Sequence, residues 1–280
     1  MVPSLSLSVY INHRGSWALS IPRQKKPGPC EKEAKPVAKL VVSGVTKRFG
    51  GLVAVNNVSF SLESGRILAL IGPNGAGKTT LFNCLTGFYK VNAGTVEYNG
   101  TNITNWTPNR IAVLGISRTF QVVQILQGMT VLENVLVGAY LRNANTVAAT
   151  DKAIEALERV GMAHQAHELA ANLTLPAKKR LEVAMSLATE PKVLMLDESM
   201  AGLTPTEIAN ATQLLKQLRS EGLALIVVEH VMEAVMPIAD SVIVLDSGTK
   251  IAEGSPRDVV SNPRVISAYL GDKYAERVQY

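Results

Sequence analysis

Residues 72–79 read Gly72-Pro73-Asn74-Gly75-Ala76-Gly77-Lys78-Thr79, and this stretch decides the fold. A short apolar run from Ile67 to Ile71 precedes it, and a helical pattern follows from Thr80. Glycines let such a loop wrap a phosphate, so that successive backbone N–H groups converge on it at the positive end of the next helix. We expect Lys78 to reach the β- and γ-phosphates of a nucleotide and the Thr79 hydroxyl to bind Mg²⁺. The predicted nucleotide contacts are Gly72, Pro73, Asn74, Gly75, Ala76, Gly77, Lys78, Thr79 and Thr80.

Two carboxylates follow a second apolar run. Val193 to Leu196 is apolar, and Asp197 and Glu198 come directly after it. The carboxyl ends of strands are where open α/β sheets bind ligands. We therefore expect Asp197 to hold Mg²⁺ through water and Glu198 to polarise the attacking water as a general base. The alternative is a pair of acids that only solvates a loop, and the nearby phosphate-binding loop makes it the weaker interpretation.

A third apolar run, Leu223 to Val228, ends in Glu229 and His230. A histidine at this end of a strand can form a hydrogen bond with a γ-phosphate. The spacing alone fits a capping or packed core histidine equally well. His164 and His167 could share a helix face, but no third ligand accompanies them, so no metal site is expected there.

The apolar runs together indicate an α/β fold. The three runs have the length and composition of strands that are buried on both faces. Between the last two, Thr206 to Glu221 has apolar residues at helical spacing. Buried strands that alternate with amphipathic helices predict a mostly parallel sheet.

The chain divides into an extension and one domain, residues 38–280. Within that domain, a nucleotide-binding core of about 38–104 and 190–280 is expected to flank a helical subdomain of about 105–189. Helical patterns in the subdomain cover Val131 to Leu141, Asp151 to Val160 and Lys178 to Ala188. Residues 1–37 mix Ser, Pro, Lys and Gly without a sustained period, so they are expected to be a disordered basic extension. An organelle transit peptide is the alternative for this extension.

Composition excludes several classes of protein. The chain has 280 residues, of which 47% are hydrophobic and 18% charged, which excludes a disordered or fibrous protein. The net charge of +5 lies entirely in the first 39 residues, which hold seven basic and two acidic side chains. A neutral body with 5% aromatic residues lacks the charge and stacking platforms that bind nucleic acid, so no nucleic-acid partner is expected. Cys30 and Cys84 are too few for a disulfide scaffold, and no apolar run approaches the roughly 18 residues of a membrane span.

With these motifs in this order, the chain from about Leu40 to its C-terminus resembles the ATPases of the ABC transporter family. Gly72 to Thr79 is similar to that family's Walker A motif, and Val193 to Glu198 is similar to its Walker B motif. His230 is similar to its switch histidine, which implies a catalytic role. Phe49 resembles the aromatic residue that stacks on adenine in the family.

The resemblance implies two further elements of the site. Gln121, after Arg118-Thr119-Phe120, is similar to the family's Q-loop glutamine, which implies a part in Mg²⁺ binding and in hydrolysis. Ala201-Gly202-Leu203-Thr204 resembles its D-loop, although Thr204 stands where the family usually has Asp. The implied fold is the P-loop NTPase fold of ABC ATPases. It is α/β, with a mostly parallel core sheet, an N-terminal antiparallel β part and a helical subdomain. The implied cofactors are ATP and Mg²⁺.

One motif departs from the family pattern. The family's signature is normally Leu-Ser-Gly-Gly-Gln, and the matching stretch here is Leu173-Thr174-Leu175-Pro176-Ala177. Thr174 keeps a hydroxyl, but both glycines are lost and Pro176 has no N–H to offer a phosphate. In the family, each nucleotide lies between the Walker A motif of one chain and the signature of the other. The resemblance therefore implies that two copies of this chain would form two weak nucleotide sites. A partner ATPase with an intact signature would complete one good site, although Thr174 and a helix that begins at Lys178 offer an alternative that needs no such partner.

Within the family, five stretches look like the ATPases of branched-chain amino acid importers: Gly50 to Val55, Arg118 to Gln121, Met129 to Val135, Met200 to Pro205 and Asn262 to Gly271. This implies a subunit that hydrolyses ATP to drive uptake of branched-chain or other small amino acids. The implied partners are membrane permease subunits, a second ABC ATPase subunit in a heterodimer rather than a homodimer, and an extracytoplasmic solute-binding protein reached through the complex. The implied location is peripheral, at the cytoplasmic face of the inner (plasma) membrane.

Two alternatives remain open at this point. The same ATPase role could serve another solute, such as urea, amides or lipopolysaccharide. A soluble ABC ATPase that acts on nucleic acid or ribosomes is the other alternative. Such proteins generally carry paired cassettes or long coiled-coil insertions, whereas this sequence has one cassette, no sustained heptads and a neutral body.

Overall fold

The computed structural model describes residues 9–11, 17–19, 39–229 and 232–270. The chain divides into two compact units, Met1–Pro36 and Val37–Tyr280. In the first unit, β1 (Val9–Ile11) pairs antiparallel with β2 (Trp17–Leu19). The disorder expected for residues 1–37 concerns positions that lie, apart from these two strands, outside the described residues.

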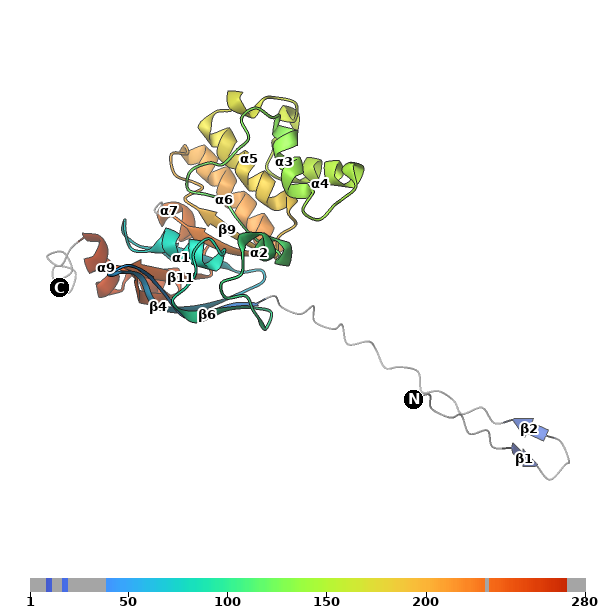
Figure 1. Ribbon diagram of the computed structural model, residues 1–280, viewed down its shortest axis with the longest axis horizontal. Helices are drawn as coiled ribbons and strands as arrows, with labels where there is room; N and C mark the ends of the chain where they lie inside the picture. Colours follow the sequence, from blue (N-terminus) through green and yellow to red (C-terminus); the bar gives the residue numbers. More distant parts are fainter. Residues whose placement is uncertain (1–8, 12–16, 20–38, 230–231, 271–280) are drawn as a thin grey trace. The chain divides into compact units, whose positions relative to one another are not determined.

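The described part of the second unit is built on a 10-stranded sheet with the order β7-β6-β3-β4-β12-β11-β5-β10-β9-β8 (Figure 1). Its strands are β3 (Lys39–Phe49), β4 (Leu52–Glu63), β5 (Ile67–Ile71), β6 (Ala93–Tyr98), β7 (Thr101–Asn102), β8 (Ile116–Arg118), β9 (Val193–Asp197), β10 (Ala224–Val228), β11 (Ser241–Asp246) and β12 (Thr249–Gly254). From β11 to β8 neighbouring strands run parallel, with Leu68 opposite Ile226 on one side and Ser241 on the other. The predicted parallel core is therefore confirmed.

The antiparallel part of the sheet comes from the N-terminal end of the domain. β3 pairs antiparallel with both β4 and β6, so that Leu40 lies opposite Leu62 on one side and Tyr98 on the other. A pairing of Thr249 in β12 with Asn56 in β4 joins this part to the parallel core. The predicted division into parallel core and antiparallel part is confirmed.

Some helices connect the parallel strands, and three others, α3, α4 and α5, lie between β8 and β9 in the sequence. They are α1 (Lys78–Leu85), α2 (Pro108–Leu114), α3 (Val131–Ala139), α4 (Thr146–Arg159), α5 (Leu175–Ala188), α6 (Pro205–Ser220), α7 (Met232–Val235), α8 (Pro256–Val260) and α9 (Pro263–Leu270), with short 3₁₀ turns at Ala163–Gln165 and Ala170–Asn172. Figure 1 shows α3, α4 and α5 grouped together, with α6 next to them. No helix among the described residues is long and apolar enough to cross a lipid bilayer.

Two helices begin earlier than their apolar patterns predict, because a capping side chain sets the start. α4 begins at Thr146 rather than Asp151, since the Asn145 side chain accepts hydrogen bonds from the first backbone N–H groups. α5 begins at Leu175 rather than Lys178. Thr174 caps it, and Pro176 fits the first turn, where a helix does not use its N–H groups.

The sheet is buried on both faces. Ile67, Ala69 and Ile71 of β5 belong to one hydrophobic cluster, which also contains buried residues of α3, α4, α5 and α6. Leu68 and Leu70 belong to a second cluster, which contains buried residues of α1 and of the antiparallel strands. This burial on both faces explains why β5 is apolar at every position. Because β5 is packed in place, the loop that follows it starts from a fixed position in the sheet.

Candidate nucleotide site

The loop between β5 and α1 is held by contacts that only glycine allows. Gly77 is the N-cap of α1 with φ 97°, and a Cβ there would lie 2.3 Å from the carbonyl oxygen of Ala54. A Cβ on Gly72 would lie 2.1 Å from the carbonyl oxygen of Leu245. The loop is therefore wedged between β4 and β11. Because the N-cap is a glycine, no capping side chain covers the first N–H groups of α1, and they can bind an anion.

Lys78, the first residue of α1, is buried at 7% exposure. Its Nζ donates hydrogen bonds to the carbonyl oxygens of Gly72 at 2.7 Å and Pro73 at 3.0 Å. Burial lowers the pKa of Lys78, and the nearby carboxylates Glu198 and Asp197 oppose that shift. The loop thus surrounds the Lys78 ammonium group, and the acids at and directly after the end of β9 help to keep it charged.

A cavity of about 980 Å³ joins the loop to three distant parts of the chain. Its lining includes Phe49, Asn74, Gly75, Ala76, Gly77, Lys78, Thr79, Thr80, Gln121 and Glu198. Phe49 lies at the end of β3 and is 42% exposed, with an edge-to-face contact to Tyr89 at 5.2 Å between ring centroids. A cavity lined by both an accessible aromatic ring and the phosphate-binding loop suits a nucleotide, which has a flat base and a charged tail.

Asp197 ends β9 and is buried. Its Oδ2 accepts a hydrogen bond from Arg118 Nη2 at 3.2 Å, whereas Oδ1 has no hydrogen-bond partner among the described residues. Burial raises the pKa of Asp197 to about 6, since it penalises the charged carboxylate; Arg118 opposes the shift, Glu198 adds to it and Lys78 opposes it. A buried carboxylate oxygen without a partner is unusual, and it suggests that a ligand completes the site.

The oxygen atoms of the three residues predicted to hold Mg²⁺ suit a hard cation. Thr79 offers a hydroxyl, Gln121 an amide oxygen and Asp197 an unpartnered carboxylate oxygen. Mg²⁺ takes oxygen ligands and usually binds one or two carboxylates together with substrate phosphates. Within the described ranges no group of three or more His, Cys, Asp or Glu side chains gathers, and a magnesium site of this kind does not need one.

Glu198 follows β9 and contacts Gln121 across the cavity. Gln121 Nε2 donates a hydrogen bond to Glu198 Oε2 at 3.2 Å. Glu198 has φ 50°, which is uncommon for a residue with a side chain, and its backbone N–H donates to the carbonyl of Val228 at 2.9 Å. Strained backbone of this kind occurs often at functional sites. The two neighbouring carboxylates thus have different surroundings: Asp197 is buried, and Glu198 lines the cavity.

The comparisons with known proteins agree with this geometry. Residues 55–201 match the family model described as "ABC transporter", and residues 249–275 match the one described as "Branched-chain amino acid ATP-binding cassette transporter".

This chain belongs to the ABC transporter family.

Several curated relatives are similar over most of their length. The chain is 42% identical over 250 residues to LivG of Escherichia coli K12, the high-affinity branched-chain amino acid transport ATP-binding protein, with 83% of this chain and 98% of that protein covered. It is 41% identical over 249 residues to BraF of Pseudomonas aeruginosa, with the same coverage. A solved nucleotide-free ATP-binding cassette from an ABC transporter is 32% identical, with a TM-score of 0.77 and coverage of 84% of this chain and 100% of that one. The fold is thus that of an ABC ATPase.

In this ABC cassette the degenerate signature is a helix start. The Thr174 hydroxyl accepts a hydrogen bond from the backbone N–H of Ala177 at 3.5 Å and caps α5. Leu175 and Pro176 form the first turn, so the proline removes one N–H from the end of the helix that could face a phosphate. Thr204 at the end of the D-loop stretch has a comparable structural role, because it forms a capping box with Glu207 at the start of α6.

Three charged residues of the site are absent from the sequence-based predictions. Arg118 pairs with Asp197, Glu182 accepts backbone N–H groups beside Gln121, and Lys179 donates from α5 to the carbonyl of Glu198 at 3.0 Å. Arg118 and Glu182 are buried, and a charged residue on the apolar face of an element is the signal that could have pointed to them. Of the other predicted residues, His230 lies outside the described part of the structure.

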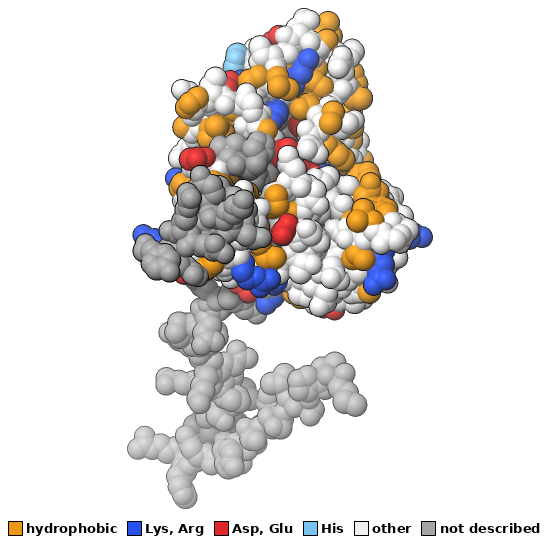
Figure 2. Space-filling model, turned by 90° about the vertical axis from the view of Figure 1, so that its left-hand side faces the viewer, with side chains coloured by type: hydrophobic (Ala, Val, Ile, Leu, Met, Phe, Trp, Pro, Cys, Tyr) orange, Lys and Arg blue, Asp and Glu red, His pale blue; other side chains and the backbone are white. Residues whose placement is uncertain are grey.

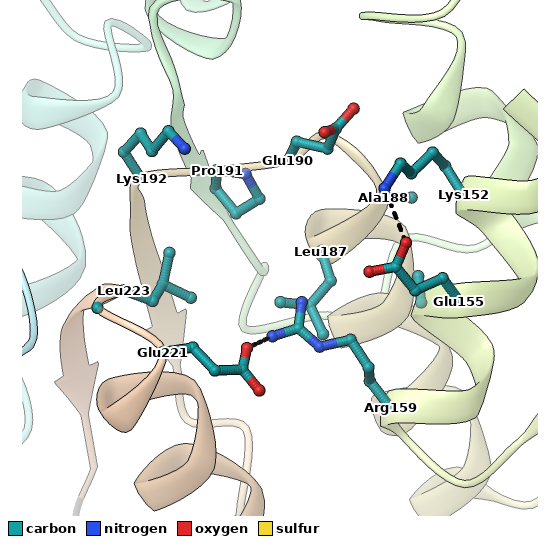
Figure 3. A pocket seen from close by; sticks show the side chains of 12 residues that line it. Lys152, Glu155, Arg159, Leu187, Ala188, Glu190, Pro191, Lys192, Glu221 and Leu223 are labelled. Atoms are coloured by element: carbon teal, nitrogen blue, oxygen red, sulfur yellow. Dashed lines mark hydrogen bonds and ion pairs between the residues drawn. The ribbon is translucent and has the colours of Figure 1, made fainter. Parts of the chain in front are cut away.

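A second pocket, of about 250 Å³, contains none of the predicted residues (Figure 3). It lies between α4 and the turns that lead into β9 and β10, at the amino ends of those strands. Figure 3 shows Arg159 and Glu221 reaching toward each other across it, and Lys152 pairs with Glu155 at 2.8 Å. Since these charges compensate one another and the carboxyl ends of the strands lie elsewhere, this pocket is not the nucleotide site.

The surface charge of one face can be followed in Figure 2. There the Lys and Arg side chains lie in separate small groups among apolar and uncharged ones. The described part of this face has no continuous basic stripe of the type that binds nucleic-acid backbones.

Proposed function

We propose that this chain is the ATP-binding subunit of an ABC importer and hydrolyses ATP to drive uptake of branched-chain amino acids through partner membrane subunits. The observation that carries the hydrolytic part is the single cavity lined by Phe49, Lys78, Gln121 and Glu198 from separate segments. The solute is supported by the branched-chain family match at residues 249–275 and by the names of the relatives LivG and BraF.

Binding of ATP rests on the loop and α1. Lys78 exchanges its two carbonyl acceptors for oxygens of the β- and γ-phosphates, while N–H groups at the start of α1 donate to the same phosphates. The ring of Phe49 stacks on the adenine. Thr79, Gln121 and, through water, Asp197 hold Mg²⁺, which neutralises charge on the phosphates.

Hydrolysis rests on Glu198 and Gln121. Glu198 is the general base that orients and deprotonates the attacking water. Gln121 positions it, because its amide donates to Glu198 Oε2 at 3.2 Å, and His230 is assigned by the motif to the γ-phosphate. A base held by a neighbouring amide keeps its orientation while the substrate binds, which lowers the cost of reaching the reactive geometry.

The proposed assembly rests on the signature stretch at the start of α5. In ABC ATPases each nucleotide lies between the Walker A motif of one chain and the signature of the other. A homodimer of this chain would place the Pro176-containing turn against both nucleotides. We therefore propose a heterodimer with a second ABC ATPase that has an intact signature. Membrane permease subunits carry the solute, an extracytoplasmic solute-binding protein delivers it, and this chain binds the permease at the cytoplasmic face of the inner membrane.

The test is solute uptake in cells that lack this chain and receive it back as wild type or as Lys78→Ala. Labelled leucine uptake should return with the wild type and stay absent with Lys78→Ala, whose purified chain should also have lost tight binding of Mg-ATP in calorimetry. Lys90→Ala is the matched control, since Lys90 is an exposed lysine after α1. Leucine uptake that is unaffected by loss of the chain, with urea or amide uptake lost instead, would overturn the branched-chain assignment.

A further inference from the structure

We propose that Glu182 on α5 is a positioning residue for Gln121, so that the helix that begins at the signature also sets the geometry of hydrolysis in its own chain. The inference rests on the proposed roles of Gln121 and Glu198. It concerns a side chain that does not line the nucleotide cavity, but holds the backbone on both sides of a residue that does.

The contacts of Glu182 bracket Gln121. Its Oε1 accepts hydrogen bonds from the backbone N–H of Phe120 at 2.9 Å and of Gln124 at 3.5 Å. Glu182 is buried at 6% exposure, whereas Gln121 is exposed. One buried carboxylate therefore fixes the entry and the exit of the short segment that carries the exposed glutamine.

Few backbone hydrogen bonds hold the part of this segment around Gln121, although the Phe120 ring contacts Phe88 and Leu126 is bound by the Asn134 side chain. After β8 ends at Arg118, residues 119–129 form neither helix nor strand. A chain without a hydrogen-bonded ladder takes its position from individual tie points. The Thr119 N–H donates to the carbonyl of Met195 at 2.9 Å, and beyond that point Glu182 supplies the next two bonds along the backbone.

The same face of α5 reaches the other half of the hydrolytic pair. Lys179, Glu182 and Ser186 are three and four residues apart, which places them on one face of a helix. Lys179 Nζ donates to the carbonyl oxygens of Glu198, at 3.0 Å, and Ala201. Ser186 Oγ donates to the carbonyl of Arg118 at 3.2 Å. α5 thus holds the backbone beneath Glu198 and the backbone around Gln121 at once.

The charge of Glu182 is itself compensated from two elements. Burial raises its pKa, and the N–H groups of Phe120 and Gln124, with the cations Arg118 and Lys179, oppose the rise. A carboxylate or an amide at this position can accept the two backbone hydrogen bonds, whereas an aliphatic side chain would leave both N–H groups without a partner.

Glu182→Gln and Glu182→Leu separate these cases in the assembled transporter. Glu182→Leu should lower kcat by about ten- to a hundredfold, since a displacement of about 1 Å at a catalytic group costs that much. Its Kd for Mg-ATP should stay within a few-fold, because the phosphate-binding loop is untouched. Glu182→Gln should retain most of the turnover. Glu155→Leu removes an exposed carboxylate from α4 and is the matched control.

A double-mutant cycle with Gln121→Ala distinguishes positioning from general stabilisation. If Glu182 acts through Gln121, adding Glu182→Leu to Gln121→Ala should cause little further loss of kcat. Additive losses, or equal loss of kcat and of nucleotide affinity, would overturn the inference. Full turnover of Gln121→Ala alone would instead refute the proposed role of Gln121, and the inference would fall with it.

Hydrogen exchange of the wild-type complex tests the contact without any substitution. The amide of Phe120 should exchange slowly although it lies outside helices and strands, and the amide of Val122 should exchange fast. Fast exchange at Phe120 would show that Glu182 does not hold this segment, whether or not Glu182→Leu folds.

Discussion

The guanidinium of Arg118 contacts one carboxylate oxygen of Asp197, with 3.2 Å between Nη2 and Oδ2, and both side chains are buried, at 6% and 0% exposure. Burial lowers the pKa of Arg118, and the carboxylates of Asp197 and Glu182 oppose the shift. A second nitrogen, Nη1, donates to the Asn83 side chain on α1 at 2.6 Å. The guanidinium therefore ties Asp197 to α1, the helix that follows the phosphate-binding loop, while the other oxygen of Asp197 has no hydrogen-bond partner among the described residues.

Arg118→Met should lower the free energy of unfolding by about 3–5 kcal/mol, because removing one partner of a buried ion pair leaves the other charge uncompensated. Arg118→Lys keeps a positive charge and should lose less. Urea unfolding followed by circular dichroism measures both, with Arg257→Met on the exposed side of α8 as the control. Stability of Arg118→Met within about 1 kcal/mol of wild type would mean that the pair contributes little.

Glu198→Gln should lower hydrolysis about 10²–10⁴-fold, the usual contribution of a positioned general base. The size of the side chain is kept, so Mg-ATP should bind with nearly unchanged affinity and the closed, ATP-bound dimer should accumulate. Phosphate release by the assembled transporter measures the rate. Glu253→Gln, which alters an exposed carboxylate on β12, should leave it unchanged. Full turnover of Glu198→Gln would require a different base.

Pro176→Gly should raise ATP hydrolysis by a homodimer of this chain about tenfold or more, because the glycine returns one N–H donor to the start of α5. A hydrogen bond to a charged group contributes about 1.5–3 kcal/mol, which corresponds to a rate change of this size. The complex with the partner ATPase should change much less. Turnover of the purified chain, alone and in the complex, measures both. Pro256→Gly, in the first turn of α8, is the matched control. A wild-type homodimer as fast as the complete complex would contradict the proposed asymmetry.

Cys84 should resist alkylation in the native chain. It lies buried on α1, and burial raises the pKa of its thiol to about 11, which Lys47 opposes. Only about one thiol in a thousand is then ionised at pH 8, and the thiolate is the reactive form. In a Cys30→Ser chain, the rate of modification should rise about tenfold per pH unit between 8 and 10, and urea should abolish the protection. Rapid labelling of the native chain at pH 8 would contradict the burial.

Much of the site could be predicted because many of its residues lie close together in short stretches of the sequence. The loop from Gly72 to Thr79 and the acids Asp197 and Glu198 sit directly after buried strands, so local pattern was enough to place them at one edge of the sheet. The apolar residues of β5, β9 and β10 likewise predicted a sheet that is covered on both faces, because a strand with one exposed face would alternate apolar and polar residues.

The contacts that assemble the site could not be predicted in this way. Arg118 and Asp197 are in contact because β8 lies beside β9 in the sheet. Glu182 binds the backbone of Phe120 because α5 packs next to the end of β8. Neither adjacency follows from spacing along the chain. Apolar periodicity also missed the start of α5, since the first turn is fixed by the hydroxyl of Thr174 rather than by hydrophobic residues.

The place of β5 in the sheet has a consequence for synthesis of the chain. β5 ends at Ile71, yet its two neighbours begin only at Ala224 and Ser241. As the ribosome works from the N-terminus, this wholly apolar strand emerges long before either edge of it can be covered, and unpaired strand edges of that kind invite aggregation. A nascent chain that stops short of Asp246 should therefore bind chaperones and no nucleotide, and the loop at Gly72 should acquire its shape only in the last part of translation.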